Sequence, residues 1–222
     1  MHRAALDMTS RKRIYTELRR SIIMGHRPPG ERLDVEKLAD HYGTSVTPIR
    51  DALQMLSEAG LVTIKPRSGY FVTRITLKQL RDLLELREII ELASVERAAV
   101  KITDEQLAAL GHVHRGYTGD DDESYDRYTE ENRQFHYLIA QASGNMELAE
   151  TLGRLHDRLA RLMVICRAGK AMEFTHARIV EALRAHDVEA ARQALLSELK
   201  TTRATILEHL IQEEGEAWHL DS

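Results

Sequence analysis

The sequence contains few cysteines and prolines and no long apolar run. Its 222 residues include one cysteine, Cys166, so no disulfide can form within the chain, and we expect a reducing, cytoplasmic setting. Four prolines and 12 glycines exclude a collagen-like or extended low-complexity chain. No stretch of 18 apolar residues occurs, and the first residues lack the apolar centre of a signal peptide. These absences predict a soluble protein with no membrane partner.

Acidic residues slightly outnumber basic ones, but the two signs are unevenly distributed. Residues 1–74 contain 13 Lys and Arg against 8 Asp and Glu, a net charge of +5. Residues 75–222 contain 18 against 27, a net charge of −9. This division predicts a first part that meets a polyanion and a second part that does not.

The first part predicts two helices, a tight turn, a third helix and a β-hairpin. Residues 1–13 are expected to form a mobile arm, followed by apolar residues at helical spacing. Asp34 is placed to cap a short helix that closes at Gly43, and Ser45 begins the next helix. Two β-prone runs with a basic turn between them occupy residues 61–73.

This order of elements is typical of a winged helix-turn-helix, in which the helix after the tight turn enters the major groove. Hydroxyls at the start of that helix and an arginine one turn later can bond phosphates or base edges. The basic hairpin can reach the DNA backbone or the minor groove. The candidate contacts from this pattern are Ser45, Thr47, Arg50, Lys65 and Arg67. For any one of them an ordinary structural role, such as a helix cap or a solvated charge, stays open.

Three motifs of this part follow one another in register: Pro29-Gly30-Glu31-Arg32-Leu33, Ser45-Val46-Thr47-Pro48-Ile49-Arg50-Asp51-Ala52-Leu53 and Pro66-Arg67-Ser68-Gly69-Tyr70-Phe71-Val72. With their neighbours they resemble the DNA-binding domain of the GntR family of bacterial transcription regulators. The resemblance implies that Gly69 of the wing joins Ser45, Thr47, Arg50 and Arg67 in contacting operator DNA. The chain departs from many relatives at Val46, where they have arginine, and at Glu36, where some have a basic residue.

Beyond Arg74 the pattern is helical to the end of the chain. Thr76 is placed to cap a long helix, and the segment from Thr103 to Gln106 resembles a capping box. Further helices are expected over residues 123–142, 146–168, 171–186 and 188–213. The predicted fold is therefore mostly α: a winged helix-turn-helix head (α+β), residues 1–74, followed by an all-α antiparallel helical bundle, residues 75–222.

The helical part contains Leu86-Arg87-Glu88-Ile89-Ile90-Glu91, Asn132-Arg133-Gln134-Phe135-His136 and Ala142-Ser143-Gly144-Asn145. These motifs are similar to the FCD ligand-binding domain of the FadR subfamily, which implies effector binding and dimerisation. Many such domains hold a divalent metal with one Asp and three His. The matching positions here carry Asn132, His136, His176 and Glu198. Two imidazoles, a carboxylate and an amide oxygen suit zinc, nickel or manganese.

The resemblance also implies a small-molecule effector, often a small organic acid, with Arg87 and Arg133 as candidate contacts. Some relatives bind their ligand without metal and one branch binds fatty acyl-CoA, and the sequence does not choose among these ligands. Each arginine has an alternative role in pairing with an acidic residue. Metal binding by His136 and His176 likewise competes with a role as hydrogen-bonded core residues. The remaining histidines match no ligand pattern and are expected to be ordinary: His112, His114, His156, His186, His209 and His219.

Together these patterns predict a ligand-responsive, sequence-specific DNA-binding transcription regulator rather than an enzyme. Two recognition helices on a palindromic operator require a homodimer. One alternative is a metal-dependent enzyme that uses the His/Glu cluster, although no motif places an acid or base group beside it. Another is an architectural DNA-binding protein without a ligand, which would show little sequence preference.

Overall fold

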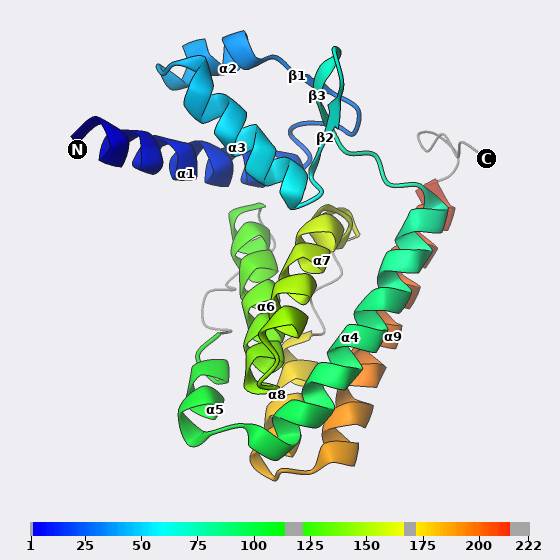
Figure 1. Ribbon diagram of the computed structural model, residues 1–222. Coiled ribbons are helices and arrows are strands. Elements are labelled where there is room, and N and C mark those ends of the chain that lie inside the picture. Colours follow the sequence, from blue (N-terminus) through cyan, green and yellow to red (C-terminus); the bar gives the residue numbers. More distant parts are fainter. Residues whose placement is uncertain (1, 114–121, 167–171, 214–222) are drawn as a thin grey trace. The chain divides into compact units, whose positions relative to one another are not determined.

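The chain forms two compact units, residues 1–75 and residues 76–222. The computed structural model describes residues 2–113, 122–166 and 172–213. Figure 1 labels the helices and strands along the chain. The first unit is a small mixed α and β domain, and the second is built from helices. Each unit has its own hydrophobic core.

The first unit contains three helices and a three-stranded sheet. The helices are α1 (His2–Ile23), α2 (Val35–Tyr42) and α3 (Val46–Glu58), and the strands are β1 (Arg32–Leu33), β2 (Val62–Lys65) and β3 (Gly69–Val72). The strand order is β1-β3-β2, with both pairs antiparallel. The core joins apolar residues of all three helices to the sheet, among them Leu18, Leu38, Ile49, Leu53 and Val72.

The turn between α2 and α3 is fixed by local chemistry. The side chain of Asp34 accepts a hydrogen bond from the backbone N–H of Lys37 and so caps α2. Gly43 closes α2 with a φ of 61°, a left-handed conformation that costs glycine little. The chain therefore turns sharply and presents the first residues of α3 to solvent.

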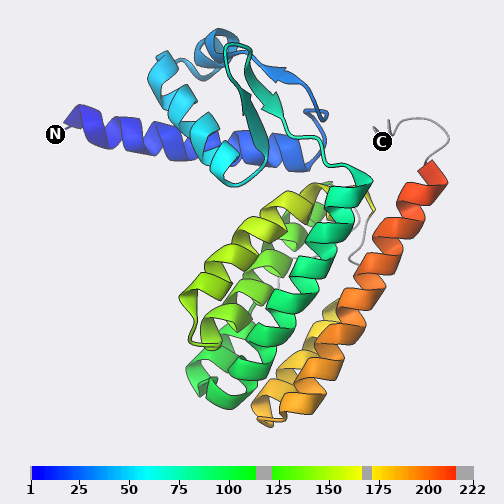
Figure 2. The ribbon, with the colours of Figure 1, turned by 45° about the vertical axis from the view of Figure 1, so that its right-hand side comes forward.

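The second unit contains α4 (Leu77–Lys101), α5 (Asp104–Leu110), α6 (Asp122–Ala142), α7 (Met146–Ile165), α8 (Met172–Arg184) and α9 (Val188–Glu213). The long helix α4 packs against α6, α7 and α9, and α8 packs against α9. Figure 2, turned from the first view, shows α4 running alongside α9. Thr76 caps α4, and Thr103 caps α5, each in a capping box with the Gln three residues later.

The sequence prediction and the structure differ at the start of the chain. Residues 1–13 were expected to form an arm, but α1 extends from His2 to Ile23. No Pro or Gly interrupts the chain before Gly25, and Ala, Leu, Met and Arg favour helix, so nothing in the sequence stops the helix earlier. Strand β1 has only two residues and was missed because so short a run has no measurable alternation.

Candidate functional site

The start of α3 presents an exposed polar surface. Ser45, Thr47 and Arg50 are exposed, whereas Ile49, Ala52 and other residues of α3 fill the core. Ser45 is the N-cap residue by position, but its side chain makes no capping hydrogen bond. The side chain of Arg50 has no ion pair or hydrogen bond to the described residues. These groups are therefore available to an external partner.

The hairpin of β2 and β3 presents the basic residues at its tip. Lys65 and Arg67 are exposed, and the ammonium of Lys65 lies 4.9 Å from the centre of the Phe71 ring. Arg67 has a φ of 61°, a conformation rarely adopted by residues with a Cβ atom. Gly69, with a φ of 108°, follows at the start of β3. The turn thus holds an arginine at a position where glycine would be less strained.

A buried polar cluster lies inside the helical unit and draws on five of its helices. Arg87 and Glu91 come from α4, Asn132 and His136 from α6, His156 from α7, His176 from α8 and Glu198 from α9. Each of these seven residues is at most 3% exposed. Burial of so many polar side chains is costly unless they bind one another or a ligand.

Three of the predicted metal ligands, His136, His176 and Glu198, lie close together. Glu198 Oε1 lies 3.1 Å from His136 Nε2 and 3.4 Å from His176 Nε2. The three residues each offer a ligand atom within 4.8 Å of the others. Asn132 precedes His136 by one helical turn and therefore shares its face of α6, and Asn132 Oδ1 is buried without a hydrogen-bond partner.

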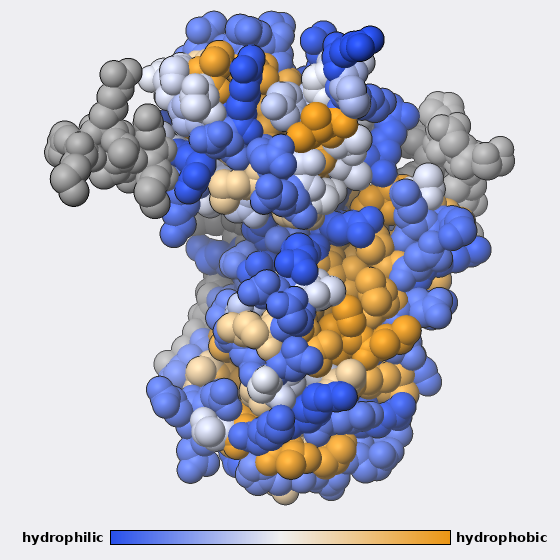
Figure 3. All heavy atoms as spheres, viewed as in Figure 1, coloured by the Kyte–Doolittle hydropathy of each residue, from blue (hydrophilic) through white to orange (hydrophobic). Residues whose placement is uncertain are grey.

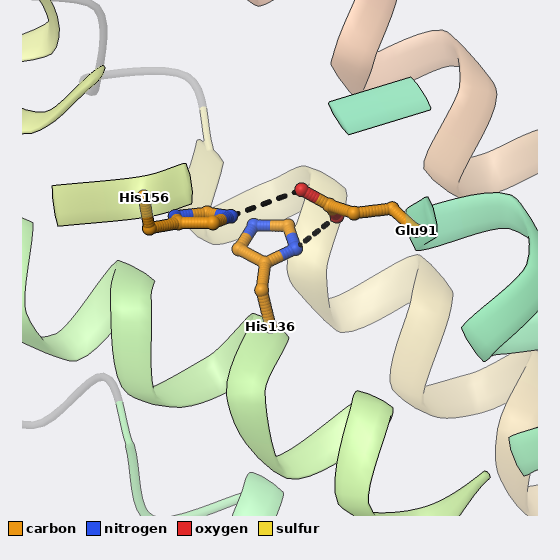
Figure 4. A group of neighbouring side chains, drawn as sticks. All are labelled: Glu91, His136 and His156. Carbon is orange, nitrogen blue, oxygen red and sulfur yellow. Dashed lines mark hydrogen bonds and ion pairs between the residues drawn. The ribbon is translucent and has the colours of Figure 1, made fainter. Parts of the chain in front are cut away.

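The other side of the His136 ring faces Glu91 (Figure 4). His136 Nδ1 lies 2.6 Å from Glu91 Oε2, and His156 Nε2 lies 3.0 Å from Glu91 Oε1. Arg87 Nε donates to the same Oε1 at 2.6 Å. His136 therefore lies between two carboxylates, with one ring nitrogen toward each.

The electrostatics of the cluster favour positive charge between the two carboxylates. Burial lowers the pKa of His136, but Glu91 and Glu198 outweigh burial and raise it to about 9. Burial would raise the pKa of Glu198, but His176 and His136 hold it below its ordinary value. For His156, burial and the neighbouring Arg87 together lower the pKa to about 4, despite the opposing effect of Glu91.

The two arginines proposed for the effector have different surroundings. Arg87 is buried in the cluster, and its Nη2 lies 3.9 Å from Glu198 Oε1 with no hydrogen-bond partner. Arg133 is partly exposed; its Nε donates to Asp157 Oδ1 at 3.1 Å, and its Nη1 lies 3.6 Å from Glu130 Oε1. The structure thus places Arg87 beside the candidate metal ligands, whereas Arg133 joins α6 to α7 through an ion pair.

Sequence reasoning missed two members of the cluster, Glu91 and His156. Glu91 follows Arg87 by four residues on the face of α4 that carries Leu80, Leu84 and Val95, all buried. Two opposite charges at i and i+4 on an apolar face indicate a buried pair, and this signal was present in the sequence. His156 was expected to be ordinary, but it lies on the buried face of α7 and contacts Glu91.

Comparisons with known proteins agree with this architecture. Residues 10–72 match the model for bacterial regulatory proteins of the gntR family, and residues 82–201 match the FCD domain. The chain is 28% identical to the HTH-type transcriptional regulator YdhC of Bacillus subtilis, over 91% of this chain and 92% of YdhC. It is 26% identical to the HTH-type transcriptional repressor RspR of Escherichia coli, over 93% and 92%.

The solved structure of McbR/YncC from E. coli has the same fold, with a TM-score of 0.73 at 23% identity over 90% of this chain and 98% of that one. None of the helices described in residues 2–213 has the length and apolar character needed to cross a bilayer. The matched families and the relatives are transcription regulators rather than enzymes. The metal-dependent enzyme considered from the sequence is therefore not favoured.

Proposed function

Because this chain belongs to the GntR family of bacterial regulators and carries an FCD domain, we propose that it binds a palindromic operator as a homodimer and responds to a small carboxylate held beside a metal ion. The broader class is established: it is a ligand-responsive DNA-binding transcription regulator. Residues 1–74 would bind DNA, and residues 75–222 would bind the effector and dimerise. Its work on chromosomal DNA would place it in the cytoplasm.

The proposed DNA interface consists of the start of α3 and the tip of the wing. Ser45, Thr47 and Arg50 would meet the major groove, and Lys65, Arg67 and Gly69 would meet the backbone or the minor groove. The assignment is supported by the exposure of all the side chains in this set and by the absence of any ion pair between Arg50 and the described residues.

The metal proposal rests mainly on the meeting of His136, His176 and Glu198 from three helices. Asn132 Oδ1 and Glu198 Oε2 are buried and accept no hydrogen bond from any part of the chain that the structure describes, and a bound cation would satisfy both oxygens. The donor set of two imidazoles, a carboxylate and an amide oxygen fits zinc, nickel or manganese. When bound, such an ion would supply a positive charge that anchors a carboxylate oxygen.

The charges of the cluster favour an anionic effector. With neutral imidazoles, Glu198 cancels one charge of a divalent ion, while Arg87 and Glu91 cancel each other. A positive charge remains, and Nη2 of Arg87, which makes no hydrogen bond to the described residues, can donate to a second carboxylate oxygen. Thr202, one turn beyond Glu198 on α9, has a buried hydroxyl oxygen without a partner and offers a further hydrogen bond. Arg133 would contact the effector only after leaving Asp157.

The proposed homodimer is supported by an apolar outer face on α4. Leu86, Ile89 and Val100 are 42%, 60% and 66% exposed, and their spacing places them near one side of the helix. Figure 3 shows apolar surface gathered along this helix. Large exposed apolar groups in a row are typical of a surface covered by a partner.

The test measures operator binding by fluorescence anisotropy in metal-loaded and chelated protein, with a panel of small carboxylic acids. We expect one or more acids to change operator affinity in loaded protein and to have no effect after chelation. The His136→Ala/His176→Ala double variant should contain no metal and should bind operator without responding to the acids. Metal-free parent protein, with parental thermal stability in the double variant, would refute the metal part of the proposal.

A further inference from the structure

Glu91 is the most heavily contacted acidic group of the buried cluster. Its Oε1 accepts hydrogen bonds from Arg87 Nε at 2.6 Å and from His156 Nε2 at 3.0 Å. Its Oε2 lies 2.6 Å from His136 Nδ1. One carboxylate on α4 therefore holds side chains of α4, α6 and α7, and Glu91 itself is 2% exposed.

These contacts argue against Glu91 as a metal ligand, although Glu91, His136 and His156 are close enough to surround a cation. A cation among them would compete with the N–H of Arg87 for Oε1 and would bring two positive charges to one carboxylate. The Glu198 side of His136 differs, because Glu198 Oε2 and Asn132 Oδ1 accept no hydrogen bond there. The geometry therefore assigns the cation to the Glu198 side.

We propose that Glu91 is a positioning residue, which holds the imidazole of His136 so that Nε2 faces the cation site while Nδ1–H faces Glu91. This inference rests on the proposed metal site and adds to it a residue outside the ligand set. A histidine ligates a metal through one nitrogen, and the group that binds the other nitrogen fixes the tautomer and the ring orientation. In this chain Nδ1 lies 2.6 Å from the buried carboxylate of Glu91, so the ring has little freedom to turn.

The same carboxylate also positions Arg87. Because Arg87 Nε is bound to Glu91, the guanidinium is fixed with Nη2 on the side of Glu198, 3.9 Å from Oε1. The group proposed to bind the effector and the group proposed to bind the metal are thus oriented by one residue. Loss of Glu91 is expected to weaken both binding events.

The experiment compares Co²⁺ binding to the full-length parent with Co²⁺ binding to Glu91→Gln. Binding is measured by titration, with the visible absorption of the bound ion as the signal. A group that binds the other ring nitrogen of a ligating histidine typically contributes about 10- to 100-fold to metal affinity, and we expect Glu91→Gln to bind Co²⁺ more weakly than the parent by about this factor. Its absorption spectrum should also change, because the His136 ring is no longer held. Glu91→Asp, which keeps a carboxylate, should recover part of the affinity.

The matched control is Glu96→Gln, which removes a carboxylate from the same helix that pairs with Arg192 instead. This variant should bind Co²⁺ as the parent does, with the same spectrum. If Glu91→Gln fails to fold because Arg87 is left as a buried unpaired charge, the Arg87→Gln/Glu91→Gln double variant removes the pair together. The Co²⁺ affinity of this double variant is compared with that of the Arg87→Gln single variant.

The outcomes separate this inference from the proposed function. Absence of Co²⁺ binding by the parent would refute the metal site itself. Binding by the parent with unchanged affinity and spectrum in Glu91→Gln would overturn only the positioning role. Two ions per chain in the parent, reduced to one in both Glu91→Gln and His156→Gln, would make Glu91 a ligand of a second site and overturn the inference.

Discussion

Arg67 occupies a backbone conformation at the wing tip that glycine would adopt with less strain. Arg67→Gly should therefore change the free energy of unfolding by less than about 1 kcal/mol. If Arg67 contacts DNA phosphate, the same change should weaken operator binding and lower the salt-dependence slope by about 1. Denaturant unfolding and anisotropy titrations at several salt concentrations measure the two effects.

A suitable control for Arg67 is Arg154→Gln, which removes an exposed positive charge from α7 in the helical unit. Its operator affinity and salt slope should equal those of the parent. If Arg67→Gly binds operator with the parental affinity, Arg67 does not contact the DNA.

Ser45 and Thr103 are both N-cap residues by position, but only Thr103 makes the capping hydrogen bond. Thr103→Ala should lower the free energy of unfolding by about 1 kcal/mol and leave operator affinity unchanged. Ser45→Ala should cost less than about 0.5 kcal/mol, because its side chain makes no capping hydrogen bond, and it should weaken operator binding if the hydroxyl contacts DNA as proposed. If Ser45→Ala loses as much stability as Thr103→Ala and keeps the parental DNA affinity, Ser45 acts only as a helix cap.

At the scale of elements, α4 buries the charged pair Arg87 and Glu91 on its inner face and exposes large apolar side chains, among them Ile89, on its outer face. If the apolar face forms the dimer interface, Ile89→Glu places a charge in a surface that loses its water on association. We expect the dimer dissociation constant to rise by about tenfold or more, measured by sedimentation equilibrium. Met146→Glu changes another large exposed apolar residue, at the start of α7, and should leave the dimer intact. A parental dissociation constant in Ile89→Glu would place the interface elsewhere.

The helices were predictable wherever their ends carry local signals. Asp34, Thr76 and Thr103 were expected to cap helices, and each accepts the backbone hydrogen bond of a cap. A cap depends on residues within four positions, so the sequence contains what is needed to find it. The start of α1 carries no such signal, and the prediction there was wrong.

The site was less predictable because its members meet only after folding. His136, His176 and Glu198 came from a resemblance, and the structure brings them together. Glu91 and His156 lie 65 positions apart, and no spacing rule links residues on α4 and α7. Sequence patterns identify which residues face a helical core, but packing of several helices decides which buried polar groups touch.

At the scale of the whole molecule, the opposite charges of the two units predict how DNA binding depends on salt. The head carries +5 and the helical unit −9, so attraction to phosphate would come from the head alone. For a dimer with six or more phosphate contacts, operator affinity should fall about a thousandfold or more between 50 and 200 mM salt. Competition with random DNA should show a preference for operator of about a thousandfold or more. An equal affinity for both DNAs would favour an architectural DNA-binding protein.

Four residues separate the last strand of the wing from helix α4, and the 25 residues of α4 extend about 37 Å at 1.5 Å per residue. Within a single turn of this rod, Leu86 and Ile89 point outward while Arg87 points into the cluster. If two such helices meet in a dimer, each effector site is one helix thickness from the symmetry axis. We then expect the two sites to fill cooperatively, with a Hill coefficient above 1. An effector that moves helix α4 of one protomer also moves the surface that contacts helix α4 of its partner.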